Sequence, residues 1–347
     1  MTDDRRERPD RLAAELAAYL AAQVPAARDV VVKDVRPIPG GLSQEMYFFT
    51  AGWQDADHRT VERPYVLRRD PPPGEGVLET SRAREARLLR AVHATGLPVP
   101  DVPWFEGDPP FALGRPFLIM DRLPGDMVRD VPAVDVGSPR FRAIGRQMAE
   151  ILGRLHALDV DHLQAATGLR PSESPSPTAA AAAQLDRHEA VLRRDQLEPQ
   201  PVLTDVLLWL RRRLPPAPTL ALVHADYRLS NLLLENDRVS GVLDWELAHI
   251  GDPMEDLGRL ISRDRPLVSG LLPRDEFIAV YEAASGITVD LDACYFWEVV
   301  ARLRAAITML TGVKAYATSG YRHLHLGFMG LSHANRLYDL LGLIEDQ

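Results

Sequence analysis

One stretch of sequence, residues 222–246, most constrains how this chain can fold. It contains two apolar runs separated by the turn-forming residues Glu-Asn-Asp-Arg, and such a pattern predicts a hairpin of two short strands. Asn231 directly precedes the first run and Asp244 directly follows the second. A hairpin would therefore place these two polar side chains next to each other.

Asp226 precedes Asn231 by five residues, and His224 lies two residues before Asp226. Magnesium-assisted phosphoryl transfer needs a carboxylate that receives the proton of the attacking hydroxyl and hard oxygen ligands for the metal. Protein kinases use the same Asp-to-Asn spacing, with a second Asp at a later strand end. Any one of these residues alone is typical of a turn or a cap. The set predicts Asp226 as catalytic base, Asn231 and Asp244 as Mg²⁺ ligands, and Arg228 as a cation that balances phosphate charge.

Residues 242–258, which read VLDWELAHIGDPMEDLG, carry a family resemblance. The chain resembles the aminoglycoside phosphotransferase-like group of small-molecule kinases, and this run is similar to the branch found fused to, or encoded near, acyl-CoA dehydrogenases. The resemblance implies an ATP- and Mg²⁺-dependent phosphotransferase enzyme. It also implies an α+β, bilobal, protein-kinase-like fold. The N-lobe (1–123, with an N-terminal helix region at 1–28) would bind nucleotide through an antiparallel sheet and one helix, and the mostly helical C-lobe (124–347) would hold the catalytic loop and the acceptor pocket.

The predicted N-lobe begins with two strands, at 30–35 and 46–49, joined by a turn that contains Gly40, Gly41 and Ser43. A glycine pair in a hairpin is by itself ordinary turn geometry. The resembling family uses a similar short loop over the nucleotide phosphates. On that basis Gly40, Gly41 and Ser43 are expected to contact phosphate.

Residues 65–69 are expected to form the third strand, where kinases place a Lys that grips the α- and β-phosphates. This chain has Arg68 at that position, a substitution that is typical of the branch it resembles. Residues 80–93 show helical spacing and contain Glu85. Glu85 is expected to pair with Arg68, with an ordinary helix-surface pair to Arg82 or Arg84 as the alternative.

An apolar run at 111–120 predicts a buried strand, and Asp-Arg-Leu-Pro-Gly ends it. In kinase-like folds the adenine lies at this hinge. Backbone groups from Asp121 to Leu123 are therefore expected to bind the base, with Met120 at the border of its pocket.

Helical patterns follow at 141–158, 179–197 and 202–214, and the Pro- and Ser-rich run 171–177 is expected to be a surface loop. Asp256 falls in the first turn of a helix after a Gly-Asp-Pro turn and is expected to be structural. Glu246 has two open roles, assisting the metal or capping the turn.

Composition excludes several classes of function. The formal net charge of −9 gives no basic footprint for nucleic acid. A single cysteine permits no internal disulfide, the start of the chain is charged, and the apolar runs are shorter than a membrane span, so a cytoplasmic location without membrane insertion is expected. The histidines His323, His325 and His333 are too scattered for a zinc site.

The acceptor is expected to be a small molecule with a hydroxyl group. Residues 264–340 are nearly neutral, which weighs against a polycationic substrate, and Arg302, Arg304, Lys314 and Arg322 would suit an anionic acceptor or form a solvated helix face. The first hypothesis is a hydroxyacyl-CoA, and the second is an aminoglycoside- or macrolide-type antibiotic. A non-catalytic nucleotide-binding regulator is the alternative from another class. A protein kinase is disfavoured because no Ala-Pro-Glu segment is present.

Overall fold

The computed structural model places two compact units along the chain, residues 1–123 and residues 124–347. It describes residues 9–24, 26–38, 45–71, 81–128, 138–174, 176–261, 271–318 and 324–345. Both helices and antiparallel strands are present, so the predicted α+β class is confirmed.

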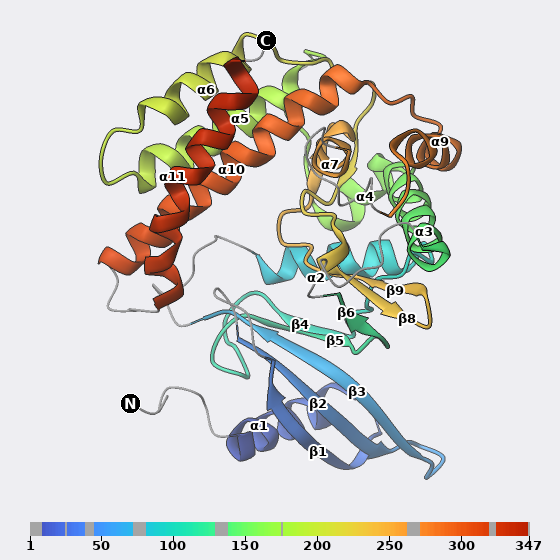
Figure 1. Ribbon diagram of the computed structural model, residues 1–347. Helices are drawn as coiled ribbons and strands as arrows, with labels where there is room; N and C mark the ends of the chain where they lie inside the picture. The colour runs from blue at the N-terminus through green and yellow to red at the C-terminus, as the bar shows by residue number, and fades with distance from the viewer. Residues whose placement is uncertain are drawn as a thin grey trace. The chain divides into compact units, whose positions relative to one another are not determined.

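The first unit is built around a five-stranded antiparallel sheet with the order β1-β2-β3-β5-β4. Its elements, shown in Figure 1, are α1 (Pro9–Gln23), β1 (Arg28–Pro37), β2 (Glu45–Gln54), β3 (Thr60–Arg69), α2 (Arg82–His93), β4 (Trp104–Glu106) and β5 (Phe117–Asp121).

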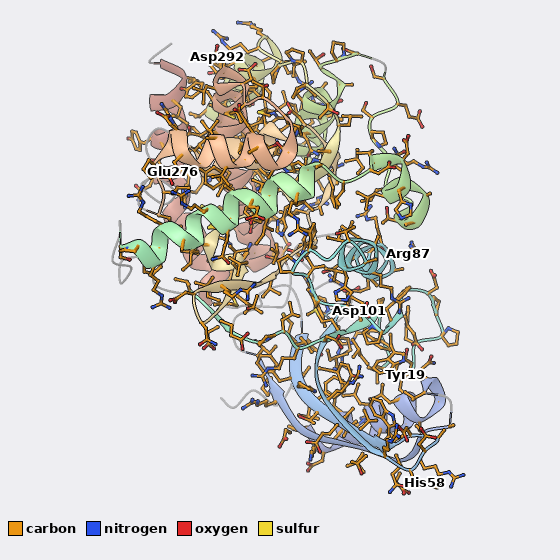
Figure 2. All side chains as sticks on the ribbon, turned by 90° about the vertical axis from the view of Figure 1, so that its right-hand side faces the viewer. Tyr19, His58, Arg87, Asp101, Glu276 and Asp292 are labelled. Atoms are coloured by element: carbon orange, nitrogen blue, oxygen red, sulfur yellow. The ribbon has the colours of Figure 1, made fainter. Side chains whose placement is uncertain are left out.

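Helix α1 covers one face of this sheet. Leu12, Leu16 and Leu20 recur at helical spacing and are fully buried against alternate residues of β2, which have the two-residue period of a strand with one covered face. Tyr19, which is labelled in Figure 2, packs edge-on against Phe117, with ring centroids 5.1 Å apart. The face covered by α1 is therefore the hydrophobic core of the first unit.

The predicted strand at 111–120 is shorter in the structure and begins at Phe117. Gly114 adopts a left-handed backbone with φ of 74°, and Pro116 has no amide for a ladder, so the residues before Phe117 form turns. Several elements were not predicted, among them strand β4 in the first unit and helix α4 in the second. Both are too short to show a clear period in sequence.

The second unit contains short strands and most of the helices. Its elements are β6 (Asp126–Met127), α3 (Pro139–His156), α4 (Val160–Thr167), α5 (Ala179–Asp195), α6 (Pro201–Arg211), β7 (Ala221–Val223), η2 (Leu229–Asn231), β8 (Leu232–Glu235), β9 (Arg238–Val242), β10 (His249–Gly251), α7 (Met254–Leu260), α9 (Arg274–Ser285), α10 (Leu291–Thr318) and α11 (Leu324–Glu345). Figure 1 shows α10 and α11 side by side, and Figure 2 shows α3 beside α9, where Glu276 of α9 pairs with Arg142 of α3 at 2.8 Å.

The predicted hairpin is confirmed as β8 and β9, which pair antiparallel from Leu232 with Val242 to Glu235 with Arg238. Asn236 and Asp237 form its turn with φ of 46° and 66°, the positive angles that a tight two-residue hairpin turn requires. Asn and Asp tolerate this conformation better than most residues. Local turn chemistry therefore sets the register of the hairpin.

Helix α7 packs closely on α10. A Cβ added at Gly258 would lie 2.4 Å from the carbonyl oxygen of Cys294 and 2.8 Å from the Cβ of Trp297, so only glycine fits there.

The turn before α7 is fixed by Asp252, whose carboxylate accepts hydrogen bonds from the Met254 amide at 2.9 Å and the Trp297 indole at 2.8 Å. Burial raises the pKa of Asp252 to about 6. This packing sets where α7 presents its side chains.

Candidate active site

The Asp226 loop, residues 224–231, leaves the end of β7. Strand β7 pairs antiparallel with β10, with Val223 opposite His249. Ala225 has a left-handed backbone with φ of 65°, and this turns the chain directly before Asp226. Tyr227 is fully buried, and its hydroxyl donates to the carbonyl of Met148 on α3 at 3.0 Å. The loop is thus anchored to the helices of the second unit.

Asp256 fixes the start of this loop from helix α7. Its two carboxylate oxygens accept the amides of His224 and Ala225, each at 2.8 Å, and His156 lies 3.2 Å from one of them. Asp256 is buried, which by itself would raise its pKa, but the hydrogen bonds and His156 hold the pKa below its usual value. The geometry agrees with the structural role expected for Asp256.

His224 connects the loop to the segment that ends at Asp244. Its Nε2 lies 3.0 Å from the carbonyl of Leu243, which can only accept, so Nε2 carries the proton. Its Nδ1 then accepts the amide of Asp226 at 3.2 Å. Burial lowers the pKa of His224, which favours this neutral form. A single buried ring therefore ties both carboxylate-bearing segments together.

The Asp226 carboxylate is surrounded by hydrogen-bond donors. Its Oδ2 accepts from the Asn231 amide at 2.7 Å and lies 3.1 Å from Nε of Arg228. Its Oδ1 lies 2.8 Å from the guanidinium of Arg259 on α7. The structure thus brings Asp226, Arg228 and Asn231 together, and it adds Arg259, which was not predicted.

Arg259 could have been found from sequence spacing. It lies three residues after Asp256 on the same helix, and residues three apart share a helix face. Once Asp256 is assigned to the loop, the face that carries Arg259 must point in the same direction. The contact between Asp256 and the loop itself spans about thirty residues, and sequence spacing alone does not show it.

Asn231 and Asp244 are neighbours through the hairpin. The amide of Leu243 donates to the carbonyl of Asn231 at 2.9 Å, directly beside the first pair of the β8–β9 ladder. Asp244 has a left-handed backbone with φ of 71°. The side-chain amide nitrogen of Asn231 donates hydrogen bonds to Asp226. The Oδ1 atom of Asn231 therefore remains available as an oxygen ligand.

This donor set fits Mg²⁺. The ion takes oxygen ligands, and proteins typically hold it through one or two carboxylates together with substrate phosphates. Within the described part of the chain, no group of three or more His, Cys, Asp or Glu side chains could hold a metal. A site of one carboxylate and one amide oxygen is too small to be such a group.

Arg304, on α10, reaches the same loop and donates to the carbonyl of Ala225. The other basic residues that were expected to suit an anionic acceptor have different partners. Arg302 pairs with Glu298 at 2.7 Å, Lys314 pairs with Asp195 at 3.2 Å, and Arg322 lies outside the described residues. Arg302, Arg304 and Lys314 thus have three separate sets of partners.

In the first unit, Arg68 contacts Glu85, as the sequence predicts. Glu85 also contacts Arg82, the partner named in the alternative, so both pairings occur at once. Arg82 in turn binds Asp70 at 2.6 Å. Arg68, Arg82 and Glu85 are buried and Asp70 is partly exposed, and the four side chains form a connected cluster between β3 and α2.

Arg68 and Met120 lie on the sheet face opposite α1. Arg68 is paired with Leu118, and Val66 with Met120, and residues directly opposite each other in an antiparallel ladder point to the same side. Tyr65 and Leu67 point to the other face, into the core beneath α1. The nucleotide-binding candidates of the two strands thus share one face.

Two of the hinge amides have backbone partners within the first unit. The amide of Asp121 donates to the carbonyl of Asp101 at 2.9 Å, and the amide of Arg122 donates to that of Pro64 at 3.2 Å. Among the described residues, none accepts a hydrogen bond from the amide of Leu123. Two of the three hinge amides are thus already bonded, and binding of the base by backbone groups from Asp121 to Leu123 stays a prediction. Gly40, Gly41 and Ser43 lie outside the described residues.

Among the described helices, none is both long and apolar enough to cross a membrane.

Comparison with known proteins gives consistent matches. The family described as "phosphotransferase enzyme family" matches residues 34–297. The Arabidopsis thaliana protein named "probable acyl-CoA dehydrogenase IBR3" is 32% identical over 279 residues, which cover 72% of this chain and 33% of that protein. This chain thus spans about a third of the length of that relative.

Solved structures show the same fold. A candidate aminoglycoside phosphotransferase from Ralstonia eutropha JMP134 has a TM-score of 0.70 and 22% identity, covering 96% of this chain and 98% of that one. A thermostable mutant of an aminoglycoside phosphotransferase, in ternary complex with ADP and hygromycin B, has a TM-score of 0.56 and 15% identity, covering 95% and 98%. These likenesses confirm the expected kinase-like fold. With the family match over residues 34–297, they place this chain in the phosphotransferase enzyme family.

Proposed function

We propose that this protein transfers the γ-phosphoryl group of ATP, with Mg²⁺, to a hydroxyl group of a small molecule. The observation that carries the proposal is the Asp226 carboxylate, bound by Asn231 and held in a loop that Asp256 and His224 fix through buried hydrogen bonds. Such preorganisation is what in-line phosphoryl transfer requires, because catalysis there is mainly positioning and charge stabilisation.

In this proposal Asp226 orients the acceptor hydroxyl and receives its proton. Arg228, which is half exposed beside Asp226, balances charge on the transferred phosphoryl group. Asn231 and Asp244 would hold Mg²⁺, which supplies charge neutralisation on the nucleotide phosphates when bound. ATP as the nucleotide is supported by the family and by the ADP complex of a structural neighbour.

The first unit is proposed to bind the nucleotide. Arg68, oriented by Glu85, would contact the α- and β-phosphates, with Gly40, Gly41 and Ser43 as further phosphate contacts. Met120 and the backbone of Asp121 and Leu123 would border the base. An Arg in place of the usual Lys offers a planar fork of donors that suits phosphate oxygens.

A hydroxyacyl-CoA is the first acceptor we propose. A relative of this chain is named as an acyl-CoA dehydrogenase, which supports an acyl-CoA connection. Three guanidinium groups, those of Arg228, Arg259 and Arg304, contact Asp226 or its neighbour Ala225. A polycationic acceptor would meet this positive charge, whereas an anionic or neutral one would not be repelled.

An antibiotic is the second candidate acceptor, because one structural neighbour contains hygromycin B. The test is ADP release from MgATP with two panels, one of hydroxyacyl-CoA thioesters and one of aminoglycosides and macrolides. Mass spectrometry of each acceptor identifies the phosphorylated product, and Asp244→Asn serves as the blank for contaminating kinases. Phosphorylation in the first panel alone supports our proposal. Phosphorylation in the second alone replaces the acceptor, and nucleotide binding without transfer to either panel would favour the regulator.

A further inference from the structure

The peptide group that joins Ala225 to Asp226 is held at both of its polar atoms. Its carbonyl oxygen accepts from Arg304, and its N–H donates to Nδ1 of His224 at 3.2 Å. A peptide group is planar, so holding both atoms fixes the orientation of the whole plane. These two contacts therefore fix the backbone from which the Asp226 side chain extends.

This arrangement opposes the intrinsic preference of Ala225. A left-handed backbone costs an L-residue such as alanine about 1–2 kcal/mol. Such a conformation persists only where its surroundings hold it. Asp256 binds the Ala225 amide at 2.8 Å on one side, and Arg304 binds the carbonyl on the other.

The Arg304 side chain also lies near a second residue, Glu255. Its side chain is only 16% exposed, and its second guanidinium nitrogen lies 3.8 Å from Glu255, the residue next to Asp256 on α7. The other carboxylate oxygen of Glu255 lies 3.2 Å from Nε2 of His249, but neither of these two buried atoms has a hydrogen-bond partner among the described residues. Arg304 therefore has little freedom to leave the loop.

We propose that Arg304 is a positioning residue for Asp226, acting through the carbonyl of Ala225. It couples helix α10 to the Asp226 loop across 79 residues of sequence. The inference rests on the proposed function, in which Asp226 is the catalytic base. A purely structural role for Arg304 would stabilise the fold and leave turnover per folded molecule unchanged.

The test uses Arg304→Gln, which removes the charge and the fork, and Arg304→Lys, which keeps the charge. Arg211→Gln is the control, because Arg211 is a partly exposed arginine that pairs with Asp186 and Glu189 on α5. For each variant we would measure kcat and KM for MgATP turnover, the ATP dissociation constant, and hydrogen exchange of the peptide that covers residues 222–229.

We expect Arg304→Gln to lower kcat about 100-fold, the effect of a small misplacement of a catalytic group, with ATP binding unchanged. The kcat of Arg304→Lys should lie between that of Arg304→Gln and that of the wild type. Exchange in 222–229 should rise in both variants and remain as in the wild type in Arg211→Gln.

Raised exchange with unchanged kcat would overturn the proposal and leave Arg304 a structural residue. Unchanged exchange would overturn it whatever the rate, because Arg304 would then not hold the loop. A wild-type protein that turns over no substrate, together with raised exchange in the variants, would remove the proposed function but keep Arg304 as the residue that positions Asp226.

Discussion

The Asp226 loop and the ion-pair cluster around Glu85 are both rich in charge, but they are held in different ways. In the loop, backbone amides and one peptide carbonyl are bound by buried side chains, above all by Asp256. In the Glu85 cluster, the ion pairs join side chains to side chains, and Glu85 has two arginine partners.

The difference teaches where each region is vulnerable. Asp256 satisfies two amides at once, so its removal leaves several buried groups without partners. When one arginine is removed, Glu85 is still paired with the other, so its buried charge keeps a partner. The loop is therefore expected to be sensitive to single substitutions, and the cluster is expected to tolerate them structurally.

Asp256→Asn should have the largest effect on stability. An asparagine offers one acceptor oxygen where two are used, and it removes the charge beside His156. We expect the free energy of unfolding to fall by about 3–5 kcal/mol, as for a broken buried pair. Urea denaturation checks this, with the exposed Asp275→Asn as the control. A loss no greater than that of the control would refute the role given to Asp256.

The buried His188, whose pKa is affected by Arg304, makes the stability of the protein depend on pH. Burial, with help from the positive charge of Arg304, lowers the pKa of His188 to about 3, below its value in the unfolded chain. The unfolded state therefore binds the proton more readily, and stability should decline as pH falls below about 6.5, by about 1.4 kcal/mol per pH unit. Asp252 acts in the opposite direction over part of this range, because its pKa is raised.

The contribution of His188 is thus measured as a difference. Unfolding free energies of the wild type and of His188→Gln are compared at several pH values between about 7 and about 4. The wild type should lose stability on acidification more steeply than the variant. Parallel pH dependences would show that His188 does not remain neutral in the folded protein.

Arg68→Gln and Arg82→Gln separate the two arginines that share Glu85. If Arg68 contacts nucleotide phosphates, its removal should weaken ATP binding about tenfold, since a hydrogen bond to a charged group contributes about 1.5 kcal/mol or more. Removal of Arg82 should change ATP affinity far less. Calorimetric titration with ATP measures both. Equal losses in the two variants would mean that the cluster acts as a unit and that Arg68 has no separate phosphate contact.

Leu123→Pro should have the smallest effect in this series. Proline removes the one hinge amide that no described residue binds, and one neutral hydrogen bond is worth about 1 kcal/mol. We expect ATP affinity to fall about fivefold relative to Leu123→Ala, which keeps the amide. Equal affinities in the two variants would exclude this amide from base binding.

Local sequence patterns predicted the elements whose contacts are short in sequence. The five-residue spacing of Asp226 and Asn231, the turn at Asn236 and Asp237, and the apolar face of α3 all follow from residues within a few positions of each other. The contact of Arg68 with Glu85, which are 17 residues apart, was expected instead from the similarity of this strand and helix to those of kinases.

Long-range contacts were not predictable in this way. Arg304 reaches Ala225 across 79 residues, and Asp256 reaches His224 across 32, so neither contact leaves a periodic signal in the sequence. The partners of two hinge amides are also distant in sequence, because the carbonyls of Asp101 and Pro64 that bind them come from separate segments. Tertiary packing decides these positions.

The measurement that tests the central claim most directly is turnover of MgATP by Asp226→Asn beside the wild type, with the ATP dissociation constant determined for both. Our account predicts that kcat falls by about 1,000-fold, within the range for loss of a general base, while ATP affinity changes by less than about twofold. Retained turnover in Asp226→Asn would contradict the assignment of Asp226 as the catalytic base.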